Sequence, residues 1–234
     1  MARSYHQSCF LARALDVLGE RWTLLIVREL ILGPRRYGEL LEALPGIGNS
    51  LLAARLKHLE RYDVVRRTRP TGAGRAGAYE LADRGHALVP VLRSFVDWGA
   101  GLEDPPPEYA DHTAWSVTAM RLTAPDEAVD FAALTQLVVD DEEFWLHADG
   151  ERVRAEVGPA PIGPDLRLTC GRETFDSLVR GQLTMEHAVA AGELVVEGEY
   201  DAARSFFEVF TLPDGTGGVA GARPSLGRTG DDHG

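Results

Sequence analysis

Residues 36–62 read RYGELLEALPGIGNSLLAARLKHLERY, and their pattern indicates how the first half of the chain folds. Its apolar residues recur at helical spacing on both sides of a Pro-Gly-Ile-Gly turn, so the pattern predicts helices over 36–44 and 49–62. Asn49 or Ser50 would cap the second helix by accepting hydrogen bonds from the amides of its first turn. Two short helices joined by a turn that contains glycine are typical of a helix-turn-helix.

The flanking segments complete the pattern of a winged helix-turn-helix. Further helices are predicted over residues 10–18, 22–32 and 86–102, the last with Pro90 in its first turn, where proline is tolerated. Two strands at 64–69 and 79–82 would form a hairpin around a flexible, Gly-rich tip at 70–77. The helices 22–32, 36–44 and 49–62, the hairpin and the long helix 86–102 follow one another in the order of a winged helix-turn-helix.

The predicted helix 49–62 has two different faces. Leu52, Leu56 and Leu59 share the face that would pack on the core. The opposite face is small, polar or basic and could enter a major groove, while arginines on or beside the hairpin tip could reach phosphates or a narrow minor groove. The alternatives are an ordinary solvated helix face and a charge run that aids solubility. The predicted DNA-contacting residues are Asn49, Ser50, Ala54, Lys57, His58, Arg61, Arg66, Arg67, Arg69 and Arg75.

Charge is divided unevenly along the chain. Residues 1–102 hold 15 Arg/Lys and 10 Asp/Glu, whereas residues 103–234 hold 9 and 26. A basic head on an acidic body is the asymmetry that phosphate binding would require, although two domains of ordinary but different charge would also produce it.

Composition shifts divide the chain into four predicted parts. These are a DNA-binding and dimerisation domain at 1–102 (the head), a proline-rich linker at 103–112, a ligand-binding domain at 113–212 (the body) and a disordered tail at 213–234. No apolar run is long enough for a transmembrane helix, no signal peptide is evident, and Cys9 and Cys170 make no disulfide framework. We therefore expect a cytoplasmic protein without a membrane partner.

The stretch from Cys9 to Gly99 resembles the HxlR-type family of bacterial winged-helix regulators. The matching pieces are Cys9, Arg13–Gly19, Arg21–Ile26, Arg28–Leu30, Gly33–Tyr37, Ala43–Ile47, Arg55-Leu56, Leu59-Glu60, Tyr79–Leu81 and Leu88–Leu92. The resemblance implies a homodimer held by the first and last helices of the head, and binding to a two-fold-related double-stranded DNA operator. The face formed by Leu88, Val91, Leu92 and Phe95 is suited to the dimer contact.

Departures from the family pattern concern the DNA-reading elements and one cysteine. Gly48-Asn49-Ser50 stands where the family usually has Ser-Pro-Lys, Ala53-Ala54 replaces a polar pair, and Gly74-Arg75 replaces prolines at the wing tip. We therefore expect few direct base contacts. Cys9 matches the cysteine that some relatives use as a redox or electrophile sensor; the alternative is a small buried hydrophobe near the dimer interface.

The second half of the chain has a mixed pattern. It predicts strands over 115–122, 143–147, 152–157 and 193–197, with a turn at Asp149-Gly150. It predicts helices over 126–139, 172–180, 185–191 and 201–210. The body is therefore expected to be an α+β domain, and the whole chain an α+β protein.

The last third of the body resembles the sterol-carrier-protein-like domain, including the version at the C-terminus of alkyl sulfatases. The matching pieces are Asp165–Cys170, Glu173–Leu178, Gly181–Thr184, Ala188 and Gly192–Gly198. The resemblance implies a sheet covered by helices around an apolar tunnel for a lipid-like or aromatic ligand. Candidate lining residues, for each of which plain core is the alternative, are Phe144, Trp145, Phe175, Leu178, Met185, Phe206, Phe207 and Phe210.

These patterns favour a DNA-binding transcriptional regulator, a repressor, whose operator affinity responds to a small apolar or lipid-like effector. His112, His147 and His187 are scattered without a nucleophile or metal spacing, so we expect no enzyme, no metal site and no cofactor. One alternative is a lipid carrier or degenerate enzyme in which the head only dimerises. Another is a body that serves only as an interaction surface.

Overall fold

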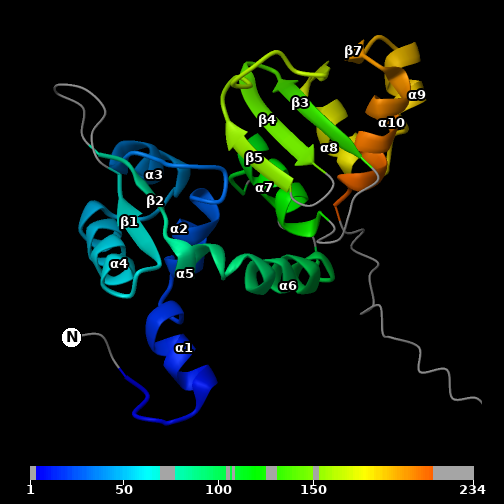
Figure 1. The fold of residues 1–234 in the computed structure, drawn as a ribbon. Helices are drawn as coiled ribbons and strands as arrows, with labels where there is room; N and C mark the ends of the chain where they lie inside the picture. The colour runs from blue at the N-terminus through cyan, green and yellow to red at the C-terminus, as the bar shows by residue number, and fades with distance from the viewer. Residues whose placement is uncertain are drawn as a thin grey trace, which may run out of the picture.

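The computed structural model describes residues 4–68, 77–103, 106, 109–124, 131–149 and 153–212 (Figure 1). The predicted tail at 213–234 and the wing tip with Arg69 and Arg75 lie outside these residues. The head contains α1 (Phe10–Leu18), α2 (Thr23–Glu29), α3 (Tyr37–Ala43), α4 (Asn49–Arg61), β1 (Val65–Arg67), β2 (Tyr79–Leu81), α5 (Asp83–His86) and α6 (Val89–Ala100). This order confirms the predicted winged helix-turn-helix.

Helices α2, α3 and α4 pack around a common apolar core. Ile26, Leu40, Leu52 and Leu59 are fully buried there, as the predicted inward face of α4 requires. The prediction that Asn49 or Ser50 caps α4 is wrong, because the turn ends one residue earlier and Gly48 is the N-cap. Asn49 is already helical, and its carbonyl accepts a hydrogen bond of 2.6 Å from Tyr37 Oη, which joins α4 to α3.

The wing is a short antiparallel hairpin in which Val65 pairs with Leu81 and Arg67 with Tyr79. Its inner residues are buried and its arginines are exposed, as strand alternation requires. The wing is also tied to the start of α3, because Arg35 and Tyr79 exchange backbone hydrogen bonds of 2.9 and 2.7 Å. Beyond the wing, α6 has Pro90 in its first turn, as predicted.

The body contains a five-stranded sheet with helices packed on it. Its elements are α7 (Thr113–Thr123), β3 (Ala132–Val139), β4 (Glu142–Asp149), β5 (Val153–Val157), β6 (Leu166–Cys170), α8 (Arg172–Val179), α9 (Met185–Ala190), β7 (Leu194–Gly198) and α10 (Tyr200–Val209). The strand order is β5-β4-β3-β6-β7, with β3 and β6 parallel and the other neighbours antiparallel. This mixed sheet confirms the predicted α+β class.

Two predicted elements of the body are wrong in type and one strand was missed. The predicted strand 115–122 is helix α7, which the head covers on one side and the body on the other, so burial of both faces obscures its helical period. The helix predicted over 126–139 is contradicted from residue 132 onward by strand β3. That strand is central and buried on both faces, and therefore shows no alternation. Strand β6 was not predicted.

The head and the body are in direct contact, and α6 of the head lies beside α7 of the body (Figure 1). Each part also contributes one leucine to the apolar core of the other. Leu122 of α7 is buried within the head's core, and Leu32 of the head is buried within the body's core. Arg93 of α6 donates hydrogen bonds of 3.2 Å to the carbonyls of Thr123 and Ala124 at the C-terminal end of α7, where a positive charge is stabilising. These contacts fix the two parts relative to each other.

Candidate nucleic-acid interface and head–body junction

The outer face of α4 is exposed and lightly charged. Asn49, Ser50, Ala54, Lys57 and Arg61 are all exposed on it. The face has few bulky groups, so backbone or base edges of a major groove could approach it closely.

His58 is placed differently from the other predicted contacts of α4. It is half-buried, its Nε2 lies 3.1 Å from the Val17 carbonyl oxygen of α1, and its ring lies 5.0 Å from that of Tyr62. His58 therefore faces α1, because the helix turns it away from the exposed face. Arg55, which was not predicted as a site residue, ion-pairs with Glu20 at 2.8 Å and anchors α4 to the segment before α2.

The described wing arginines have acidic partners within the chain. Arg66 Nε lies 2.7 Å from Glu80, a hydrogen bond that raises the pKa of Arg66. Arg67 Nε lies 3.2 Å from Glu60, and its guanidinium lies 5.0 Å from the centre of the Tyr79 ring. The sequence shows no carboxylate between Arg66 and Arg75. In the fold, however, Glu80 across the hairpin and Glu60 of α4 provide carboxylate partners for the two wing arginines. Both side chains remain mostly exposed, so DNA phosphates could still reach them.

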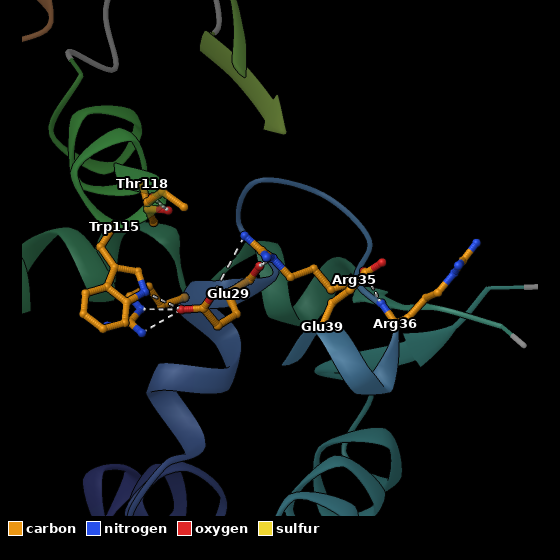
Figure 2. Close-up of polar contacts among 8 residues, drawn as sticks. Glu29, Arg35, Arg36, Glu39, Trp115 and Thr118 are labelled. Atoms are coloured by element: carbon orange, nitrogen blue, oxygen red, sulfur yellow. Dashed lines mark hydrogen bonds and ion pairs between the residues drawn. The ribbon is translucent and has the colours of Figure 1, made fainter. Parts of the chain in front are cut away.

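A buried carboxylate joins the head to the body (Figure 2). Glu29 Oε1 accepts hydrogen bonds from Arg28 Nε at 3.0 Å, Arg28 Nη2 at 2.6 Å and Trp115 Nε1 of α7 at 2.8 Å. Arg35 Nη2 lies 3.8 Å from the other oxygen, and the Arg28 guanidinium lies 4.2 Å from the centre of the Trp115 ring. We call these four residues the Glu29 cluster.

The Glu29 cluster holds two arginines around one acid. The pKa of Arg28 is lowered, mainly because burial disfavours its charged form; Arg35 adds to this, and Glu29 opposes it. Arg35 also donates to the Glu29 carbonyl and pairs with the wing through Tyr79. The cluster was not predicted, since 86 residues separate Glu29 from Trp115 and no short motif contains both.

An apolar cleft with a volume of about 360 Å³ lies next to this cluster, between α2, α6 and α7. We call it the junction cleft. Its lining residues are Leu24, Leu25, Arg28, Leu92, Phe95, Val96, Trp115, Thr118, Ala119 and Leu122. Arg28 is the only charged residue among them, and the Thr118 hydroxyl donates to the Ala114 carbonyl oxygen within its own helix.

Comparisons with known proteins match the two parts of the chain separately. The model of the HxlR-like helix-turn-helix family matches residues 17–106, and that of the SCP-2 sterol transfer family matches residues 119–211. The chain is 38% identical over 93 residues to the HTH-type transcriptional regulator YvaP of Bacillus subtilis, covering 40% of this chain and 86% of YvaP. The chain belongs to the HxlR-like helix-turn-helix family.

Other HxlR-type relatives match the same part of the chain. The HTH-type transcriptional regulator YodB of Bacillus subtilis is 36% identical over 85 residues, covering 36% of this chain and 76% of YodB. The solved structure of reduced YodB is similar to 43% of this chain and 99% of that chain, at 33% identity and a TM-score of 0.38. The two family-model matches and the relative YvaP show that the protein is an HxlR-type transcriptional regulator with an SCP-2 domain, and its family implies DNA binding.

The ligand-binding residues predicted in the SCP-2 domain are mostly packed against one another. The seven residues of the set other than Trp145 are buried in the body's core. The ring of Phe206 lies 5.2 Å from that of Phe207 and 4.8 Å from that of Phe210. Trp145 is the exception, because it follows Phe144 along β4 and therefore projects from the opposite face of the sheet. Ligand binding by this set stays a prediction.

Cys9 is exposed at the N-cap of α1. The pKa of its thiol is lowered, because the backbone N–H groups of Ala12 and Leu11 stabilise the thiolate. Cys170 is buried in the body, and burial, together with Asp140 and Asp176, raises the pKa of its thiol to about 12. The two cysteines thus differ strongly in expected reactivity.

No group of three or more His, Cys, Asp or Glu residues that could hold a metal ion occurs within the described residues. None of the helices in that part of the chain combines the length and apolar character needed to cross a membrane.

Proposed function

We propose that this regulator binds a two-fold operator as a homodimer and represses transcription from it. The observation that carries the proposal is the outer face of α4, where Lys57 and Arg61 stand beside small residues that leave room for DNA. Arg66 and Arg67 of the wing would contact phosphates beside the groove. We retain the predicted division into a head at 1–102 and a body at 113–212.

Apolar side chains on α1 and α6 support the dimer. Phe10 is 82% exposed, Phe95 55% and Trp98 69%, and α1 projects from the rest of the head (Figure 1). Two helices with large exposed apolar residues are expected to be covered by a partner. Of the predicted dimer face, Val91 and Phe95 are exposed, whereas Leu92 is buried in the head's own core.

The body would make operator binding responsive to a small apolar effector. The support is the SCP-2 match together with the contacts that fix the body to the head. An effector changes operator affinity only if it binds the DNA-bound and free conformations with different affinity. Cytoplasmic localisation follows from this role as a regulator of DNA.

A binding assay with the protein's own upstream DNA tests the proposal. We expect salt-dependent binding that favours this duplex over one of shuffled sequence. Lys57→Ala and Arg61→Ala should each weaken it, while Arg204→Ala, a basic residue on α10 of the body, should not. Equal affinity for both duplexes would refute the proposal, and a monomer by analytical ultracentrifugation would refute the homodimer.

Exposure of Cys9 and the lowered pKa of its thiol support a second role as an oxidant or electrophile sensor. Peroxide or quinone treatment should then release the operator from the wild type and not from Cys9→Ser. Equal release from both proteins would exclude sensing by Cys9.

A further inference from the structure

The junction cleft has the size and chemistry of a small-molecule site. Its volume of about 360 Å³ falls within the range of ligand pockets, and its walls come from three helices of both parts of the chain. Leu24 belongs to α2, Phe95 to α6 and Ala119 to α7. Because the walls are apolar, a bound molecule must itself be largely apolar.

The polar end of the cleft is Arg28. Glu29 accepts from its Nε and Nη2, and among the described residues Nη1 donates no hydrogen bond. Arg28 and Arg35 both ion-pair with Glu29, and within the described part of the chain neither has a second carboxylate partner. The Glu29 cluster therefore holds two positive charges against one negative charge, and its Arg28 side lines the cleft in a partly buried setting, where an anionic group is stabilised.

We propose that the junction cleft binds the effector, and that the effector is a small, apolar carboxylate. Its apolar part would lie between Phe95 and Ala119, with the carboxylate at Arg28 Nη1. This inference rests on the proposed function, that of an effector-controlled DNA-binding regulator. The sequence predicted the effector site among the aromatic residues of the body's core. The junction cleft lies outside that core.

The Glu29 cluster connects this site to the DNA-binding elements. A ligand carboxylate at Nη1 would share Arg28 with Glu29 and so weaken their ion pair, and Glu29 also holds Trp115 and Arg35. Arg35 is paired with Tyr79 of the wing and directly precedes the N-cap of α3. Binding therefore alters the support of the wing and of α3, which Tyr37 joins to α4. It also bears on α6, whose outer face is the proposed dimer contact.

Binding of 2-naphthoate to the full-length protein, measured by titration calorimetry, tests the inference. We expect binding that lowers operator affinity, and a loss of at least about tenfold in naphthoate affinity for Ala119→Phe, which fills the cleft. Ala190→Phe, the same change at an exposed position of α9, should bind like the wild type. Neutral 2-naphthamide should bind more weakly than naphthoate, and Arg28→Gln should remove this difference.

Three results would overturn the inference while operator binding remains intact. The first is no naphthoate binding up to about 1 mM. The second is equal naphthoate affinity for Ala119→Phe and the wild type, which places the ligand elsewhere. The third is conversion of the dimer to a monomer by Ala119→Phe, which shows that a second copy occupies the cleft. Failure of the proposed function would appear differently, as the absence of operator preference without any probe.

Discussion

Removal of the Glu29 carboxylate should destabilise the whole chain and loosen the body from the head. Breaking a fully buried ion pair costs about 3–5 kcal/mol, because the remaining charge is left without compensation. The side chain of Glu29 is 2% exposed, whereas Arg28 and Arg35 are 22% and 19% exposed and keep some contact with water. We therefore expect Glu29→Ala to lower the free energy of unfolding by about 2–3 kcal/mol.

Thermal and urea unfolding, followed by tryptophan fluorescence and circular dichroism, measure this loss. A chain of this length should lose roughly 4–12 °C in Tm. Glu29→Gln should cost less, because its amide oxygen can still accept from Trp115. Glu42→Ala, which removes an exposed carboxylate of α3, is the control and should change little. A loss below about 1 kcal/mol for Glu29→Ala would refute the reasoning that this carboxylate joins the two parts.

Three further predictions concern other parts of the molecule. Lys57→Ala should reduce the slope of log affinity for DNA against log salt by about one, as for one lost phosphate contact; an unchanged slope would place Lys57 away from the DNA. Iodoacetamide at neutral pH should label Cys9 and spare Cys170, whose raised pKa keeps its thiol protonated; mass spectrometry that finds native Cys170 labelled would contradict this. Gly198→Ala should lower the free energy of unfolding by at least about 1 kcal/mol, because Gly198 has φ +123° and an added Cβ would lie 2.5 Å from the Asp165 carbonyl oxygen. Gly163→Ala, where an added Cβ meets no atom within 4 Å, is its control, and equal stability of the two variants would contradict the steric argument.

The head was predictable where a helix buries one face and leaves the other exposed, as α4 does. Leu52, Leu56 and Leu59 recur at helical spacing, and α4 lies where that spacing places it. The body was less predictable because α7 and β3 are buried on both sides and lose their period. The mixed pattern nevertheless predicted the correct α+β class, because the other predicted strands and helices of the body match β4, β5, β7 and α8 to α10.

The candidate site was predictable only where function depends on local sequence. Exposed residues of α4 follow from its period, but the contact of His58 with Val17 depends on how α1 packs. The Glu29 cluster combines α2, the start of α3 and the distant α7, so its geometry exists only once the body has docked. Carboxylates that pair with Arg66 and Arg67 likewise come from other elements.

The exchange of Leu122 and Leu32 between the two cores has a consequence for synthesis on the ribosome. The head leaves the exit tunnel first, yet one of its core side chains lies on α7 and is translated later. Until then the head has an unfilled position, and Leu32 has no body to cover it. Because domains generally fold as they are made, the nascent head would pass through a loosened intermediate that closes only when α7 arrives. A design that grafts this body onto another head would have to supply a residue in place of Leu32 and leave room for Leu122 in that head's core.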